Sequence, residues 1–266
     1  MSEASASVPA LERGLNLLRL FRRTRPAITP PEMARELGIP RSTVHRLVAA
    51  LEAMGFLRRL ENGGGYALGP AVLSIGFEYL GSLDIVSLSN PVLARLRDDT
   101  NCSTHLAIRN GTDVVYLSRN PSRAAITSNV SVGSVLPAHA TVIGRVMLAD
   151  LTPAELAQLY AGRPLPKFTD QTPASLAGLE RILAEDGRRG YAVSQSFYEL
   201  GVTSVAAAVR DATTRAVAAI NAVAVDAERD AALGSEVADR VIAAAALISQ
   251  MLGAPAAQDQ RRIAHG

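Results

Sequence analysis

The chain has 266 residues, of which 48% are hydrophobic, and a formal net charge of +2 at pH 7. This length favours two domains over one, and the apolar share suffices for a core in each. The single cysteine excludes an intramolecular disulfide framework. Because neither a signal peptide nor an apolar run of membrane-spanning length is visible, we expect a cytoplasmic protein without a membrane partner.

Charge is divided unevenly along the chain. Residues 1–69 contain ten arginines against six acidic residues, a net +4, whereas the remainder has 17 basic and 19 acidic residues, a net −2. A basic small domain ahead of a mildly acidic larger one suits a DNA-reading domain joined to a sensing domain. Alternatively, a net charge of +4 is small enough to be ordinary surface charge without a DNA partner.

The first predicted helix spans residues 9–23. Its apolar side chains recur at helical spacing on one face and are Leu11, Leu15, Leu18 and Phe21. We expect this face to cover the core of the helices that follow. The three arginines between residues 22 and 25 either contact phosphate or stabilise the end of this helix through its dipole.

Residues 29–54 predict two short helices joined by a tight turn. Thr29 is a candidate N-cap, followed by prolines that a first helical turn tolerates. Gly38 is placed to end the first helix in the left-handed conformation, and Pro40 restarts the chain. The second helix has an inward stripe at i, i+3, i+4 and i+7, formed by Val44, Leu47, Val48 and Leu51.

The outward face of the second helix is polar and cationic, with no acidic residue before Glu52. The residues that we assign to DNA contact there are Arg41, Ser42, Thr43, His45 and Arg46. Two helices, of which the second is cationic, are typical of a helix-turn-helix, whose second helix enters the major groove. A small helical hairpin without a DNA partner has the same local pattern.

A β-hairpin is predicted directly after these helices. Residues 56–60 indicate a strand, the glycine-rich stretch 61–65 a turn, and residues 66–68 a returning strand. Arg58 and Arg59 lie on the first strand, where a minor groove or phosphates are expected. The unit is therefore predicted to be a winged helix-turn-helix.

Short runs in this unit resemble the DNA-binding half of the IclR family of bacterial transcriptional regulators. They are Ser42-Thr43-Val44-His45-Arg46-Leu47, then Leu51-Glu52 with Gly55, and Tyr66-Ala67-Leu68-Gly69. The resemblance covers nearly the whole chain, since the second half carries matching signatures. It implies binding to double-stranded DNA at a palindromic operator as a homodimer, with a homotetramer as the alternative.

Gly69-Pro70 marks a domain boundary, after which residues 71–82 predict a helix. Its apolar side chains lie on more than one face and are Val72, Leu73, Ile75, Phe77, Tyr79 and Leu80. A short helix that is apolar all round is buried or pairs with a partner, so we expect a contact between two copies of the chain. The predicted domains are a DNA-binding domain over 8–69, a linker helix over 70–83 and an effector-binding domain over 84–254.

The second domain is predicted to have an α+β fold, because its strands are flanked by grouped helices. The expected helices are 85–99 with Asp84 as candidate cap, 140–149, one beginning at a capping box of Thr152 and Glu155, 173–189 and 228–252. The expected strands are 103–109, 114–119, 125–130, 191–196, 202–210 and 216–225. The family resemblance implies a GAF-like domain with an antiparallel sheet flanked by helices.

The stretch 132–148 resembles the signature of the family's effector domain, in which a Gly–Leu–Pro turn leads into a helix of small residues. Small residues at the helix start, from His139 to Val142, leave backbone N–H groups accessible, and such a start suits a carboxylate. Alternatively, Ala140 and Gly144 serve only close packing.

A second signature resembles the strands that line the ligand pocket of this family, and it comprises 190–193, 199–202, 204–209 and 218–221. Ser204 and Asn221 are polar residues in otherwise apolar strands, and a buried polar group needs a partner such as a ligand. The resemblance implies that both face the effector. Many relatives have a cysteine or another small residue in place of Ser204, so the identity of their effectors does not transfer.

We therefore expect a small carboxylate effector, and specifically an aromatic acid such as a hydroxybenzoate. The stretch 119–144 also resembles, more loosely, the branch of the family that controls aromatic-acid catabolism through the β-ketoadipate route. Thr141 and Ser204 would add hydroxyl donors, and Asn221 or His139 would bind a ring hydroxyl. The full set of expected effector contacts is Leu136, His139, Ala140, Thr141, Val142, Ser204, Val205, Asn221 and Val223.

Two other classes of function stay open. Cys102 and His105 could serve an enzyme of small acids, but their spacing on a strand places the two side chains on opposite faces. The four histidines show no metal-ligand spacing and no phosphate-binding glycine loop is present, so we expect neither metal nor cofactor. In the other class the winged helix binds a protein and not DNA. A fragment of residues 1–82 that fails to bind DNA even when dimerised would favour this class.

Overall fold

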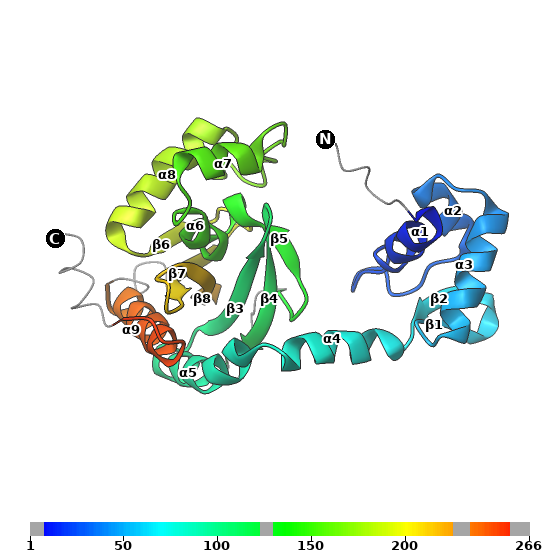
Figure 1. Cartoon of the computed structure of the whole chain (residues 1–266), viewed down its shortest axis with the longest axis horizontal. Coiled ribbons are helices and arrows are strands. Elements are labelled where there is room, and N and C mark those ends of the chain that lie inside the picture. Colours follow the sequence, from blue (N-terminus) through cyan, green and yellow to red (C-terminus); the bar gives the residue numbers. More distant parts are fainter. Residues whose placement is uncertain (1–7, 123–129, 226–234, 256–266) are drawn as a thin grey trace. The chain divides into compact units, whose positions relative to one another are not determined.

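The computed structural model describes residues 8–122, 130–225 and 235–255 (Figure 1). The chain divides into two compact units between Ser82 and Leu83. Most of the predicted strand 125–130 and the start of the predicted helix 228–252 lie outside the described residues.

The first unit is a helical core with a small antiparallel hairpin. Its elements are α1 (Pro9–Leu18), α2 (Pro30–Leu37), α3 (Arg41–Ala53), β1 (Leu57–Arg59), the 3-10 turn η1 (Glu61–Gly63), β2 (Tyr66–Leu68) and α4 (Ala71–Gly81). The hairpin pairs Arg58 with Ala67 across its strands. This arrangement is the predicted winged helix-turn-helix.

Helix α1 is shorter than predicted, and only part of the predicted apolar face is buried. It ends at Leu18 because the chain then folds back on itself, with reciprocal backbone hydrogen bonds between Arg22 and Arg25 of 2.9 and 3.2 Å. Leu17 is fully buried, whereas Leu11 and Leu15 are 59% and 50% exposed. Phe21 lies in the core of this unit and Leu18 packs against it, as predicted. The prediction was wrong for Leu11 and Leu15, because helical spacing alone does not say how far along a stripe the core extends.

The turn between α2 and α3 follows the sequence expectation. Thr29 precedes α2, and its N–H and hydroxyl both donate to the Glu32 carboxylate, over 2.8 and 2.6 Å. Gly38 ends the helix with φ of 63°, a left-handed conformation that costs little without a Cβ. Val44 and Val48 of α3 are buried in the core of this unit, against side chains such as Met33.

Helix α4 keeps its large apolar side chains exposed within the chain. Phe77 is 66% exposed, and Leu73 and Ile75 are 61% and 62% exposed. Among the described residues, no single helix is long and apolar enough to cross a membrane, and only α4 and α5 taken together reach that length and composition.

The second unit contains one antiparallel sheet with helices on both faces (Figure 1). Its helical elements are α5 (Asp84–Thr100), η2 (Ala138–Ala140), α6 (Val142–Leu148), α7 (Pro153–Tyr160), α8 (Leu176–Arg189) and α9 (Ser235–Met251). Its strands are β3 (Ser103–Asn110), β4 (Asp113–Asn120), β5 (Val135–Pro137), β6 (Ala192–Gln195), β7 (Val202–Arg210) and β8 (Ala216–Val225). They lie in the order β5-β4-β3-β8-β7-β6.

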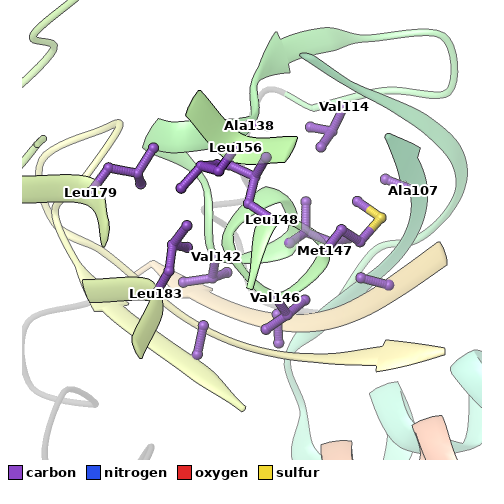
Figure 2. Packing of buried hydrophobic residues seen from close by; sticks show 14 of the residues in the cluster. Ala107, Val114, Ala138, Val142, Val146, Met147, Leu148, Leu156, Leu179 and Leu183 are labelled. Carbon is purple, nitrogen blue, oxygen red and sulfur yellow. The ribbon is translucent and has the colours of Figure 1, made fainter. Parts of the chain in front are cut away.

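Helix α6 lies against the sheet and is buried along its whole length. Figure 2 shows its side chains, such as Val146 and Met147, between the sheet and the side chains of α7 and α8. Small residues of the sheet, including Ala107, allow this close approach. Helices α5 and α9 pack on the strands from the other side (Figure 1).

Several boundaries in this unit differ from the predicted ones. Leu83, and not Asp84, is the N-cap of α5, and Asp84 lies in its first turn. The helix predicted from residue 173 begins at Leu176, because the Ser175 side chain caps it by accepting from the Gly178 N–H over 3.1 Å. The short strand β5 was not predicted at all.

Candidate functional site

The outer face of α3 is exposed and cationic. Arg41, Ser42, His45 and Arg46 are exposed, and Thr43 is half-buried. Within the described part of the chain, Arg41 and Arg46 form no ion pair. Because no carboxylate neutralises these guanidinium groups, the whole face presents uncompensated positive charge.

The two arginines of the wing differ in their surroundings, although both were expected to meet DNA. They alternate in direction on β1, as successive residues of a strand do. The Arg59 guanidinium donates to the Tyr66 hydroxyl over 2.6 Å, lies 5.3 Å from the centre of that ring, and is 3.8 Å from the Glu52 carboxylate. Arg58 has no ion pair among the described residues, so its charge is the more available one.

The arginines that follow α1 mostly serve the fold. Arg22 donates through Nη1 to the carbonyl oxygens of Arg19 and Phe21. Arg25 forms ion pairs with Glu32 and Glu36 of α2. For these two side chains the contacts favour stabilisation of the helix ends over phosphate contact.

The second unit contains a partly open cavity of about 70 Å³ on the sheet face that packs against α6. It is bounded by strands of the sheet, by the start of α6 and by the segment that connects β6 to β7. Its lining comprises His105, Tyr116, Val130, Leu136, Ala140, Thr141, Val142, Ser194, Phe197, Tyr198, Glu199, Val202, Ser204, Asn221 and Val223.

Most of the expected effector contacts lie together around this cavity. They are Leu136, Ala140, Thr141, Val142, Ser204, Asn221 and Val223. Val205 does not belong to them, because neighbouring residues of a strand point to opposite faces and Ser204 takes the cavity side. Val205 is fully buried and pairs with Ala222 of β8 on the opposite face.

His139 also lies away from the cavity, contrary to the prediction. Its Nε2 atom is 3.0 Å from the carbonyl oxygen of Pro166, and its ring faces those of Tyr160 and Phe168. Burial lowers the pKa of His139, which keeps the ring neutral. It therefore joins the cavity wall to the 166–168 segment and is not placed to bind a ring hydroxyl.

The start of α6 is two residues later than expected and is already capped. Thr141 is its N-cap, and the Thr141 hydroxyl accepts from the Gly144 N–H over 3.2 Å and donates to the Pro137 carbonyl over 3.4 Å. Thr141 is thus not the free donor that the sequence suggested. The N–H groups of Val142 and Ile143 are those that the first turn leaves without an intrahelical partner.

Gly144 supports the packing interpretation that the sequence left open. A Cβ atom at this position would lie 2.3 Å from the carbonyl oxygen of Ala138, much closer than any normal contact. The glycine therefore permits α6 to approach the η2 turn.

The polar centre of the cavity is a chain of three side chains. His105 Nδ1 is 2.9 Å from Asn221 Oδ1, and Asn221 Nδ2 donates to the Ser204 hydroxyl over 3.2 Å. Asn221 and Ser204 were predicted, whereas His105 was considered only as a partner of Cys102. The pairing of β3 with β8 brings His105 opposite Asn221, and no local pattern reveals that pairing.

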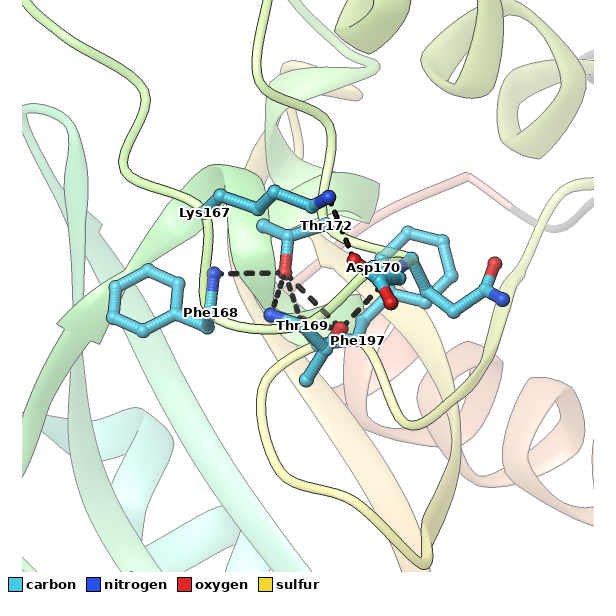
Figure 3. Close-up of polar contacts among 7 residues, drawn as sticks. Lys167, Phe168, Thr169, Asp170, Thr172 and Phe197 are labelled. Atoms are coloured by element: carbon cyan, nitrogen blue, oxygen red, sulfur yellow. Dashed lines mark hydrogen bonds and ion pairs between the residues drawn. The ribbon is translucent and has the colours of Figure 1, made fainter.

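Phe197 and Tyr198, which sequence analysis did not assign to the site, form one wall together with Glu199. The hydroxyl groups of Thr169 and Thr172 donate to the Phe197 carbonyl over 3.1 and 2.5 Å, as Figure 3 shows. The guanidinium carbon of Arg145 lies over the Phe197 ring, 4.6 Å from the ring centre. These contacts fasten the wall to the rest of the unit.

Arg145 itself forms a buried ion pair with Asp186 of α8. Nε and Nη2 donate to the two carboxylate oxygens over 2.8 and 2.7 Å, and both side chains are at most 3% exposed. Burial raises the pKa of Asp186, and the positive charge of Arg145 opposes that rise. The pair locks α6 to α8 behind the cavity.

The features considered for enzyme chemistry are occupied by other contacts. Cys102 is buried, with its sulfur 3.5 Å from the Thr100 carbonyl oxygen, whereas His105 is bonded to Asn221. No group of three or more His, Cys, Asp or Glu side chains could hold a metal ion in the described residues.

Comparisons with known proteins agree with this geometry. The model of the bacterial transcriptional regulator IclR C-terminal domain matches residues 77–250, and that of the IclR helix-turn-helix domain matches residues 10–61. The HTH-type transcriptional regulator XynR of Escherichia coli (strain K12) is 31% identical over 249 residues, which cover 94% of this chain and 99% of that protein.

Solved structures of similar chains share the fold. An IclR homolog from Microbacterium hydrocarbonoxydans, complexed with 4-hydroxybenzoate, is 26% identical with a TM-score of 0.78, covering 91% of this chain and 98% of that one. An IclR family transcriptional regulator from Brucella abortus is 28% identical with a TM-score of 0.75, covering 94% and 95%.

Fold and site together define a DNA-binding regulator with a winged helix and an α+β second domain. The chain belongs to the IclR family of bacterial transcriptional regulators. Its function is therefore transcriptional regulation, and the relatives it matches are regulators and not enzymes.

Proposed function

We propose that this regulator reads a palindromic operator through the outer face of α3, with Arg58 on the adjoining phosphates. The supporting observation is that Arg41 and Arg46 are exposed on α3 without an ion pair among the described residues. An arginine in the major groove can bond a guanine edge with two donors, and Ser42, Thr43 and His45 beside it add polar contacts.

Two half-sites require two copies of the reading helix. Helix α4 supports such a dimer, because Phe77 and its apolar neighbours are exposed in the single chain. Burying them against a second copy would remove that surface from water. A tetramer is the alternative assembly.

Two variants test this part of the proposal. Arg46→Ala is expected to weaken binding to DNA from upstream of the protein's own gene by about 1–3 kcal/mol in fluorescence anisotropy. Arg95→Ala, which removes an 85% exposed side chain of α5, is the control.

Phe77→Asp should shift sedimentation from dimer to monomer or aggregate and weaken operator binding, whereas Glu78→Gln should not. A wild-type monomer that protects a palindrome would contradict the assembly.

The cavity of the second unit is proposed to bind a small carboxylate that modulates operator binding. Ligand pockets generally combine apolar walls with a few polar groups, and here Leu136, Val142 and Val223 surround Ser204 and Asn221. The N–H groups of the first turn of α6 and the hydroxyl of Ser204 are the donors we assign to the carboxylate.

We propose an aromatic acid such as a hydroxybenzoate as the effector. A cavity of about 150 Å³ holds a benzene ring, so with the observed volume of about 70 Å³ part of the lining must shift outward to admit the ring. The 4-hydroxybenzoate complex of a relative with the same fold favours this choice over an aliphatic acid. Glu199 lies at the lining but is exposed, so water and salt screen its repulsion.

Calorimetry with benzoate, 4-hydroxybenzoate and benzamide tests the effector proposal. The acids should bind more tightly than the neutral amide, and Ser204→Ala should lose roughly 1.5–3 kcal/mol of that affinity because one charge-assisted hydrogen bond is removed. Ser87→Ala is the control, because the Ser87 hydroxyl donates to the Asp84 carbonyl on the exposed side of α5. Equal binding of the amide and the acids would refute the anion site.

A further inference from the structure

One ring nitrogen at the cavity has no partner in the described chain. His105 is 1% exposed, and its ring lines the cavity edge-on to the ring of Tyr116, with centroids 5.6 Å apart. Nδ1 is bonded to Asn221, whereas Nε2 has no hydrogen-bond partner among the described residues. Buried polar atoms are nearly always hydrogen-bonded, so a ligand atom is the expected partner.

The hydrogen-bond chain determines what kind of atom Nε2 needs. Asn221 donates through Nδ2 to the Ser204 hydroxyl, which turns its carbonyl oxygen Oδ1 toward His105. A carbonyl oxygen only accepts, so Nδ1 of His105 carries the proton. In a neutral imidazole Nε2 is then an acceptor.

The ring is neutral at the working pH. Burial lowers the pKa of His105 to about 4, the bond to Asn221 opposes that change, and the charge of Arg119 adds to it. Arg119 lies opposite His105 on β4. Nε2 therefore offers a lone pair near pH 7, while the hydroxyl hydrogen of Ser204 remains free to bond an acceptor.

We propose that His105 selects the effector by requiring a hydrogen-bond donor, so that the ligand is a hydroxy acid. Its hydroxyl group donates to Nε2 of His105, and an oxygen of the same ligand accepts from Ser204. A ligand without that donor leaves a buried acceptor unpaired. This inference rests on the proposed function, in which the cavity binds a small carboxylate.

Matched ligands test the requirement on the full-length protein. Calorimetry at pH 7.5 compares 4-hydroxybenzoate with 4-fluorobenzoate, and lactate with pyruvate, because each pair differs mainly in whether a hydroxyl donor is present. We expect the hydroxy member to bind roughly 10- to 100-fold more tightly, the usual effect of leaving one buried group unpaired. His105→Phe should remove most of this preference while retaining an aromatic ring.

A second measurement uses the wild-type protein alone, without a ligand or a variant. Nitrogen-15 NMR of the wild-type imidazoles should show one ring with the proton on Nδ1 and a bare Nε2, unchanged from pH 7.5 to 5.5. A proton on Nε2 would mean that the Asn221 amide is turned around, and the ligand preference would then reverse.

The outcomes separate the two proposals. Binding of the acids without preference for the hydroxy members would overturn the role of His105 and leave the carboxylate site standing. No binding of any of the four acids would refute the proposed function and this inference with it.

Discussion

The side chains of His105 and Asn221 are 116 positions apart in the chain, yet they share a hydrogen bond of 2.9 Å. The two residues are opposite each other in the pairing of β3 with β8. Ser204 extends the chain of bonds from β7, the next strand. A polar centre made from three strands is therefore held by the sheet itself, and its orientation does not depend on loops.

The first prediction concerns stability and pH. His105 has a pKa of about 4 in the folded protein and about 6.5 when unfolded, so the unfolded chain binds more protons between these values. The free energy of unfolding should fall as pH is lowered from about 6.5 to 4, by at most about 1.4 kcal/mol per pH unit from this residue. Urea titrations of wild type and His105→Gln at several pH values measure this fall in the free energy of unfolding.

The difference between the two proteins isolates His105, because His139 and the carboxylates titrate in both. That difference should be flat above pH 6.5 and should vary only below it. A parallel pH dependence in both proteins would show that the His105 ring is not buried in its neutral form.

The second prediction concerns the ion pair of Arg145 and Asp186. Asp186→Asn leaves a guanidinium charge buried without its carboxylate, and we expect a loss of about 3–5 kcal/mol in urea unfolding. Replacing both residues, as Arg145→Met with Asp186→Leu, should recover much of that loss. Glu185→Gln, in a side chain that is 47% exposed and pairs with Arg189, should cost under about 1 kcal/mol. Equal losses for Asp186→Asn and Glu185→Gln would refute the assignment.

The third prediction compares two helical glycines. Gly144→Ala places a Cβ atom 2.3 Å from the Ala138 carbonyl oxygen, so α6 must move and the protein should lose about 1–3 kcal/mol of stability. Gly187 lies in α8, and a Cβ there meets nothing within 4 Å. Gly187→Ala should therefore stabilise by about 0.5–1 kcal/mol. Thermal unfolding measures both variants, and the melting temperature should fall for Gly144→Ala and rise for Gly187→Ala. Two shifts of the same sign would contradict the packing argument.

The fourth prediction separates the two arginines of the wing. Arg58→Ala should reduce the slope of log affinity against log salt by about 1 without changing stability, because one phosphate contact is lost. Arg59→Ala should change that slope less and should cost about 0.5–1 kcal/mol of stability, since its guanidinium stacks on Tyr66. DNA binding at several salt concentrations, with Arg95→Ala as the control, measures the difference. Identical slopes for both wing variants would show that Arg59 leaves Tyr66 to meet DNA.

Local signals predicted the elements well where the physics is local. Thr29 before α2, Gly38 at its end and the capping box of Thr152 all lie where the sequence placed them. Strands β7 and β8 have the predicted bounds. Caps, turns and strand propensity act over a few residues, so a single sequence contains the information for them.

The faces toward which side chains point were harder to predict than the helices and strands themselves. Leu11 and Leu15 face solvent although their spacing is helical, and Val205 faces away from the cavity although its neighbour Ser204 lines it. The Val205 error was avoidable, because residues i and i+1 of a strand cannot share a face. The face that α1 buries depends on what packs against it.

The sequence by itself determined the winged helix, the class of the second domain, the cationic face of α3 and most of the polar and apolar residues of the cavity. Only the tertiary structure decided that His105 belongs to that cavity, that His139 does not, and that Phe197 closes one side. The physical reason is that strand order and helix docking join residues far apart in the chain, and their contacts leave no periodic trace in the local sequence.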